Sequence, residues 1–66
     1  MKNRIKEERI NRGITQVQLA EIVSVSRQTI ISIESGRYVP SVLLALKIAK
    51  ALSKKLEQLF ELESGD

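Results

Sequence analysis

Apolar residues recur at helical spacing along most of this chain, in short segments separated by turn-forming residues. The first segment has Ile5 as its clearest inward residue, and Ile10 is a weaker candidate. Asn3 can cap this helix, and Gly13 can end it in a left-handed conformation. The same spacing predicts four further helices, at residues 16–23, 27–34, 42–52 and 55–60.

The second and third helices are separated by only three residues. Thr15 and Gln18 have the spacing of a capping box, which predicts the start of the second helix. Residues 24–26, Ser-Val-Ser, then form a tight turn whose valine is expected to be buried and whose last serine can cap the third helix. In that third helix Ile30 and Ile33 share an inward face. Gly36 is expected to end it.

The fourth predicted helix is the most apolar segment of the chain. Pro40 discourages helix at the preceding residue, and Ser41 can cap the helix at 42–52. Four residues form its inward stripe: Ala45, Ile48, Ala49 and Leu52. The last predicted helix, at 55–60, should close the core with Leu56, Leu59 and Phe60. The following "FELES" alternates and fits either a short strand or a frayed tail.

Length and composition restrict how such a chain can be stabilised. Sixty-six residues form one domain, 1–66, with a core at 5–60 and an acidic tail at 61–66. The chain has no Cys and no His, so disulfides and thiolate or imidazole metal sites are excluded, and no cofactor is expected. A core this small requires well-packed helices or a partner subunit.

Charge divides the chain into two unequal parts. Residues 1–56 hold all eleven Lys and Arg residues and four of the eight acidic ones, a net charge of +7. Residues 57–66 hold the other four acidic residues and no basic one. This pattern fits a polyanionic partner, and it fits an ordinary solvated surface equally well. No apolar run is long enough to span a membrane or to act as a secretory segment, so we expect a cytoplasmic protein.

Two short helices joined by a tight turn are a helix-turn-helix when the second helix has a polar outer face. Here that helix, 27–34, begins with Arg27 and Gln28, the side chains that pair bidentately with guanine and with adenine. Ser32 and Ile31 lie one turn further along the same face. Ile31 fits an apolar contact with a thymine methyl group, or else a rotated core position or a stray surface residue. We therefore predict that Arg27, Gln28, Ser32 and Ile31 contact bases in the major groove.

Phosphate contacts are expected around the same helix. The amides of Gln16 and Val17 begin the helix that crosses the DNA backbone, and a helix N-terminus attracts an anion. Further candidates are small polar, aromatic and basic side chains close by: Thr29, Arg37, Tyr38 and Ser41. Thr29 also fits a plain helix residue, and Ser41 a cap without a ligand. Residues 15–41 are neutral overall, which predicts weak non-specific binding and a shallow salt dependence.

Taken together, these motifs resemble the Cro/C1-type, or Xre-type, helix-turn-helix family of phage and prokaryotic repressors. The resemblance covers about residues 5–60 and rests on "TQ", "LA", "VSRQTI", "IE.G" and "PS" in that order. It implies an all-α, five-helix, lambda-repressor-like domain that binds a two-half-site operator as a homodimer. Base contacts would then come from Arg27, Gln28 and Ser32, while Gln16 would bind phosphate and brace the reading helix. It also implies a structural ion pair between Arg9 and Glu34.

Departures from the family pattern lie before the last helix. Family members often have Gly after the fourth helix and Ser or Thr before the fifth, whereas this chain has Ser53 and Lys55. The cap of the last helix is therefore expected to be weak.

Dimerisation is expected for a second reason, because apolar side chains are in surplus near one end of the chain. These are Leu43, Leu46, Leu59, Phe60 and Leu62. A two-fold dimer would place its reading helices about 34 Å apart, so the operator should be pseudo-palindromic with half-site centres about 10 base pairs apart.

Two other functions are compatible with a small domain of this kind. An enzyme is disfavoured because no nucleophile sits with a usable base and no Gly-rich phosphate loop is present. An antitoxin or adaptor that uses the same fold to hold a protein partner is the stronger alternative, because a fold alone does not specify function.

Overall fold

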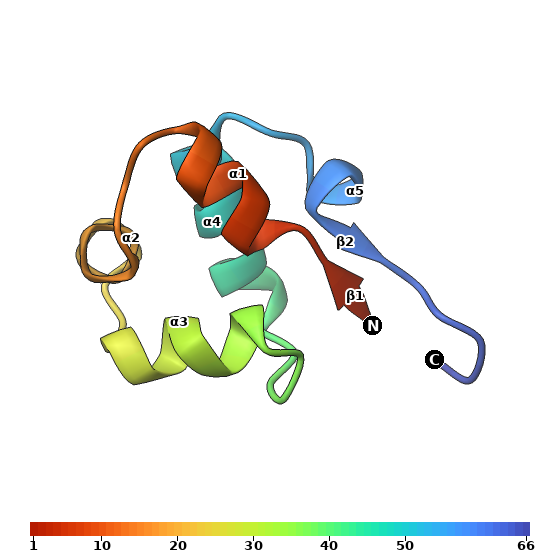
Figure 1. Cartoon of the computed structure of the whole chain (residues 1–66). Helices are drawn as coiled ribbons and strands as arrows, with labels where there is room; N and C mark the ends of the chain where they lie inside the picture. Colours follow the sequence, from red (N-terminus) through yellow and green to blue (C-terminus); the bar gives the residue numbers. More distant parts are fainter.

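Five short helices surround one apolar core, and a small two-stranded ribbon joins the two ends of the chain (Figure 1). The computed structural model describes all residues, 1–66. Its elements are β1 (Lys2–Asn3), α1 (Ile5–Asn11), α2 (Gln16–Val23), α3 (Arg27–Glu34), α4 (Val42–Leu52), α5 (Leu56–Leu59) and β2 (Phe60–Glu61). The all-α five-helix architecture expected from the sequence is confirmed. None of the helices combines the length and hydropathy needed to cross a membrane.

The core draws on every helix. Its eleven members are Ile5, Leu19, Ala20, Val23, Ile30, Ile33, Leu44, Ile48, Ala49, Leu52 and Leu59. Full burial of an Ile or Leu side chain contributes about 1.5–3 kcal/mol, so this cluster is the main source of stability. Leu44 was not among the inward residues predicted for α4, but it is buried. It lies one helical turn before Ile48 and therefore shares its face. Ile10, a weaker candidate for the interior, is instead 56% exposed.

Side-chain caps begin three of the helices where the sequence predicted them. Thr15 and Gln18 form the complete capping box at the start of α2. The hydroxyl of Ser26 accepts the amide of Thr29, and that of Ser41 accepts the amide of Leu44. These bonds satisfy amides that a helix leaves unpaired at its first turn.

The last helix is shorter than expected, and the reason lies in the N-terminal residues. α5 ends at Leu59, because Phe60 takes an extended backbone and pairs with Asn3 while Glu61 pairs with Lys2. The antiparallel pairing confirms a short C-terminal strand. Its partner strand β1 was not anticipated, since a two-residue strand has no recognisable period.

Leu59 corrects one expectation about the subunit interface. Its side chain is 1% exposed and packs in the core, so it has no surface to offer a second copy. The turn of α5 directs Leu59 inward, while the half-buried Phe60 only borders the core.

The start of α5 is capped by a single side-chain hydrogen bond. The amide of Lys55 donates to Oε1 of Gln58 at 2.8 Å, which is the glutamine half of a capping box. Before it, Ser53 ends α4 in the left-handed region at φ 54°, where family members often have Gly. The start of α5 therefore has one side-chain hydrogen bond, and the residue that ends α4 before it is a serine in a strained conformation.

Candidate nucleic-acid interface

The helix-turn-helix consists of α2, a three-residue turn and α3. Ser24 occupies the left-handed region at φ 61°, which lets the chain reverse within three residues. Val25, which was expected to be buried, is only partly buried against the core, and Ser26 caps α3 as predicted. Behind the turn, Ala20 and Val23 of α2 and Ile30 of α3 belong to the same buried cluster. The two helices are therefore held at a fixed relative position.

α3 lies along the lower edge of the molecule in Figure 1, at the surface. Arg27 and Gln28, its first two residues, are exposed. Ile31 and Ser32 are half-buried, so part of each side chain remains accessible. The outer face that the sequence predicted for base contacts is thus accessible at its N-terminal end.

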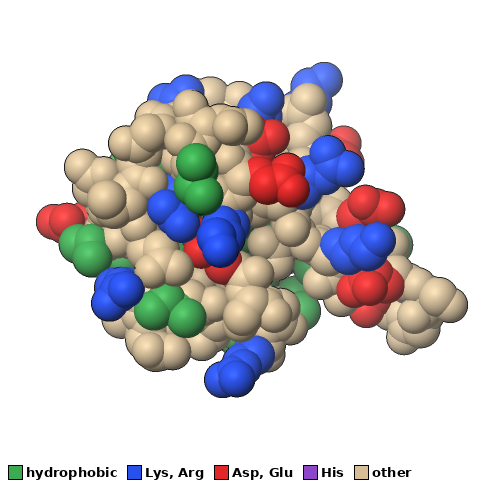
Figure 2. All heavy atoms as spheres, viewed as in Figure 1, with side chains coloured by type: hydrophobic (Ala, Val, Ile, Leu, Met, Phe, Trp, Pro, Cys, Tyr) green, Lys and Arg blue, Asp and Glu red, His purple; other side chains and the backbone are tan.

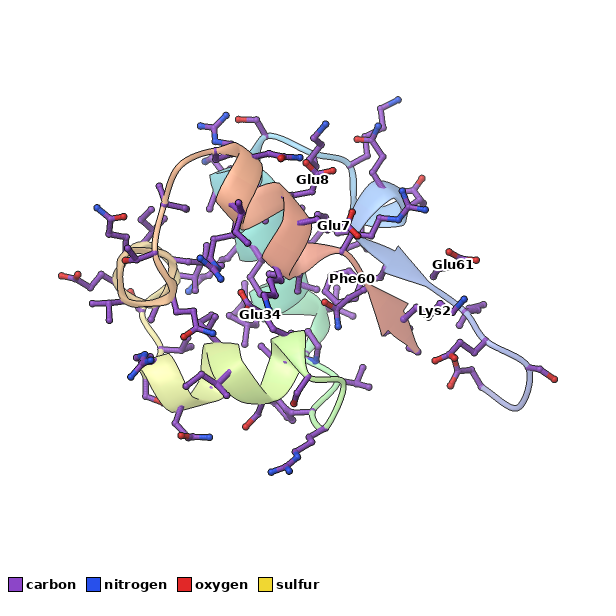
Figure 3. All side chains as sticks on the ribbon, in the orientation of Figure 1. Lys2, Glu7, Glu8, Glu34, Phe60 and Glu61 are labelled. Carbon is purple, nitrogen blue, oxygen red and sulfur yellow. The ribbon has the colours of Figure 1, made fainter.

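A network of polar side chains connects α1, α2 and α3 behind this face. Nε of Arg9 donates to Oε2 of Glu34 at 2.7 Å, and Nη1 of Arg9 donates to the carbonyl of Ile14 at 2.9 Å. Both side chains of the ion pair are largely buried, 10% exposed for Arg9 and 5% for Glu34. Figure 3 shows Glu34 between α1 and α3. The ion pair expected from the family resemblance is therefore present.

Gln16 extends the network to the start of α3. Its Nε2 donates to Oε1 of Glu34 at 3.1 Å, and its Oε1 accepts from Nε of Arg27 at 3.4 Å. The bracing role expected for Gln16 thus corresponds to observed hydrogen bonds. The Nη atoms of Arg27 and the second amide hydrogen of Gln16 are left over for a ligand.

The segment after α3 is held by backbone bonds. The amides of Arg37 and Tyr38 both donate to the carbonyl of Ser32, at 3.0 and 3.2 Å. Gly36 permits this turn because it takes φ 82°. The side chains of Arg37 and Tyr38 remain exposed next to the end of α3.

The other candidate phosphate ligands lie at helix N-termini. Thr29 shares a hydroxyl–hydroxyl bond of 2.9 Å with the cap residue Ser26. Ser41 accepts an amide through its oxygen and keeps its own O–H free to donate. The amides of Gln16 and Val17 precede the one that the Thr15 cap satisfies, so they have no helical partner.

Charge is unevenly spread over this face of the molecule. Figure 2 shows Asp and Glu side chains interleaved with Lys and Arg on the right, over α5 and the β-ribbon, whereas the charged side chains at the surface around α3 are mainly Lys or Arg. An anionic partner is therefore favoured more at α3 than at the mixed-charge surface of the ribbon. No group of three or more acidic side chains is arranged to hold a metal ion.

One contact to this region was missed by the sequence reasoning. Nδ2 of Asn3 donates to the carbonyl of Ile33, in the last turn of α3, at 2.8 Å. Asn3 was expected only to cap α1, and its Oδ1 does accept the amide of Ile5 at 3.2 Å, although Arg4 occupies the cap position. Nothing local in the sequence indicates the second bond, because its two residues lie 30 positions apart.

Comparison with known proteins agrees with this geometry. A family model described as helix-turn-helix matches residues 5–59, which includes all five helices. The chain belongs to this family, whose Cro/C1-type members are DNA-binding transcriptional regulators.

The relatives are of similar length to this chain. The uncharacterized HTH-type transcriptional regulator YgzD of Bacillus subtilis is 57% identical over 63 residues, covering 96% of each chain. An uncharacterized HTH-type transcriptional regulator of Methanocaldococcus jannaschii is 48% identical over 66 residues, covering 100% of each. Among solved structures, the restriction-modification controller protein C.AhdI of Aeromonas hydrophila matches with a TM-score of 0.80 and 32% identity, over 86% of both chains.

Proposed function

We propose that this protein is a sequence-specific regulator of transcription that binds double-stranded DNA as a homodimer, most simply as a repressor in the cytoplasm. The observation that carries the proposal is the placement of Arg27 and Gln28. Both are exposed at the start of a helix whose opposite face is buried and whose end is held by the Arg9–Glu34 ion pair. Rigid support of this kind lets hydrogen-bonding side chains discriminate between bases.

In this proposal α3 enters the major groove with its N-terminal end. Arg27 donates two hydrogen bonds to guanine O6 and N7, and Gln28 pairs with adenine N6 and N7. Ser32 contacts a further base, and the exposed part of Ile31 meets a thymine methyl group. Each bidentate pair discriminates against a wrong base by about 1–3 kcal/mol.

Phosphates flank the reading helix on both sides. The free amides of Gln16 and Val17, and the second amide hydrogen of Gln16, face one strand at the start of α2. On the other side the donors are Thr29, Arg37, Tyr38 and Ser41. Few of these groups carry a full charge, so we expect a shallow dependence of affinity on salt.

The second subunit is proposed to pack on exposed leucines. Leu43 and Leu46 of α4 are 66% and 51% exposed, and Leu62, just after β2, is 76% exposed. Phe60, which is half-buried against the core, is proposed to contribute its exposed part. We call these four residues the proposed dimer surface. It would place two copies of α3 about 34 Å apart, on half-sites about 10 base pairs apart.

Selection of binding sites from random double-stranded DNA tests the proposal. We expect an enriched inverted repeat. Arg27→Ala should lose preference at one position per half-site, at a cost of about 1–3 kcal/mol. Arg12→Ala removes the same charge from an exposed residue after α1, and it should leave the preference unchanged.

Two results would contradict the proposal. Weak, salt-sensitive binding without an enriched sequence would favour the antitoxin or adaptor function, in which the fold holds a protein partner. A protein that sediments as a monomer at micromolar concentration, and that Leu46→Ser leaves unchanged, would exclude the homodimer.

A further inference from the structure

Asn3 is bonded to two separate helices through the two ends of its side-chain amide. Oδ1 accepts the amide of Ile5 at the start of α1, at 3.2 Å, and Nδ2 donates to the carbonyl of Ile33 in α3, at 2.8 Å. Both bonds are partly buried, which shields them from competition with water. A side chain in this position fixes the end of α3 relative to the N-terminal segment.

The same residue is tied to the C-terminal strand by the backbone. Asn3 pairs with Phe60 in the ribbon, and the next amide, of Arg4, donates to the carbonyl of Leu59 at 2.8 Å. Figure 3 shows Lys2 and Glu61 on these adjoining strands, with Phe60 where α5 passes into β2. Phe60 and Leu62 belong to the proposed dimer surface. Asn3 therefore connects the ribbon part of that surface directly to α3, whereas Leu43 and Leu46 lie on α4, which shares the core with α3.

A small movement of α3 would matter for base contacts. An eight-residue helix is about 12 Å long, so a rotation of about 10° about its C-terminal end displaces its first residues by about 2 Å. Hydrogen bonds tolerate only about 0.5 Å of variation in length. Arg27 and Gln28 lie at the end of the helix that moves.

We propose that Asn3 is a positioning residue that couples the dimer surface to the orientation of the reading helix. This inference rests on the proposed function. In the dimer, the ribbon takes its position from the second subunit, and Asn3 transmits that position to α3. Asn3 would thus help determine which spacing between half-sites the dimer accepts.

Two substitutions separate this role from the capping of α1. Asn3→Ser keeps a side-chain acceptor for the amide of Ile5, but its shorter side chain has one polar atom in place of two and should not also reach the Ile33 carbonyl. Asn3→Asp has nearly the same shape and keeps the cap, yet it places a carboxylate oxygen against the Ile33 carbonyl. Asn11→Ser makes the matched change at an exposed residue whose side-chain amide donates to Glu8 on the same helix.

The first measurement is amide hydrogen exchange in the free protein. The amides of Gly36 and Arg37, which close the last turn of α3, should exchange about five- to tenfold faster in Asn3→Ser, and faster still in Asn3→Asp. Asn11→Ser should match the wild type. Unchanged exchange in both Asn3 variants would overturn the proposal whether or not the protein binds DNA.

The second measurement is affinity for the selected operator and for operators one base pair shorter or longer between half-sites. We expect the wild type to discriminate between these spacings at least tenfold and both Asn3 variants to discriminate several-fold less, with dimer association unchanged. Faster exchange with full discrimination would show that Asn3 only stabilises the fold, which contradicts positioning. A wild type that selects no sequence would instead overturn the proposed function, while the exchange result would still report on the Asn3 bond.

Discussion

Glu34 shows how one residue can stabilise the fold and also hold the helix that carries the proposed DNA-binding face. Its carboxylate receives donors from Arg9 of α1 and Gln16 of α2, while Glu34 itself ends α3. Three helices are therefore joined at a side chain that is 5% exposed. The satisfied donors explain how a carboxylate is tolerated in a small interior.

Glu34→Ala should reduce the free energy of unfolding by about 3–5 kcal/mol, because it leaves the Arg9 guanidinium buried without its partner. Denaturant unfolding measures this change. Glu21→Ala removes an exposed carboxylate from α2 and should alter stability by less than about 0.5 kcal/mol. If Glu34→Ala melted normally but lost DNA binding, Glu34 would be a DNA-contacting residue rather than a structural one.

At the C-terminal ends of helices α1 to α4, the chain takes a left-handed backbone conformation that glycine adopts more easily than serine. Gly13 and Gly36 take positive φ values of 73° and 82°, which glycine adopts without strain. Ser24 and Ser53 take similar conformations at φ 61° and 54° with a side chain present. Each of these serines costs stability that a glycine would not, on the order of 1 kcal/mol.

Ser53→Gly should therefore raise the free energy of unfolding by about 1 kcal/mol. Ser35→Gly is the matched control, because Ser35 caps α3 in the right-handed region at φ −79°. Glycine there gains nothing from the backbone and loses the bond from the Ser35 hydroxyl to the Ser32 carbonyl, so the control should be destabilised. Thermal unfolding of both variants measures whether each substitution raises or lowers stability. A destabilised Ser53→Gly would refute the argument from strain.

At the scale of the whole molecule, the two chain ends are joined by charge as well as by the ribbon. The Met1 amino group lies 3.1 Å from Glu63 and 3.2 Å from Asp66. Hydrogen bonding to Glu63 and then to Asp66 raises the pKa of this amino group above its ordinary value of 8.0. The pKa of Asp66 is lowered below 3.8, first by the bond from the Glu63 amide and then by the amino group.

The directions of these two pKa shifts predict the pH range in which the C-terminal residues Glu63 and Asp66 stay bound to the Met1 amino group, an arrangement that we call the closed tail. The raised pKa of the amino group favours the closed tail below about pH 8, and this contribution is lost as pH rises through the folded-state pKa. The lowered pKa of Asp66 favours it above about pH 3.8, and that contribution is lost as pH falls through the folded-state pKa. Chemical shifts of the Glu63 and Asp66 amides should change at both limits.

Acetylation of the Met1 amino group should abolish the alkaline transition and leave the acidic one weakened but present, because the Glu63 amide still binds Asp66 at 2.7 Å. An alkaline transition that survives acetylation would have to come from another group. These ion pairs lie at the surface, so global stability should change little in either case.

Much of the fold could be predicted from the sequence because its signals are local. Apolar periodicity located the five helices, the Thr15–Gln18 spacing and the serines at 26 and 41 marked helix starts, and Gly13 marked an end. The polar outer face of α3 follows from the same periodicity, since Ile30 and Ile33 must face inward. The Arg9–Glu34 pair came from the family resemblance instead.

Other features were decided only by the tertiary structure. The β-ribbon pairs residues from opposite ends of the chain, and the Asn3–Ile33 bond spans 30 positions. Leu59 was assigned to a subunit interface because sequence shows that a residue is apolar, whereas burial depends on what packs around it. Local propensity and period thus determined which segments are helices and which side chains share a face. The closing of those helices on one another determined which polar atoms found partners and which leucines were left at the surface.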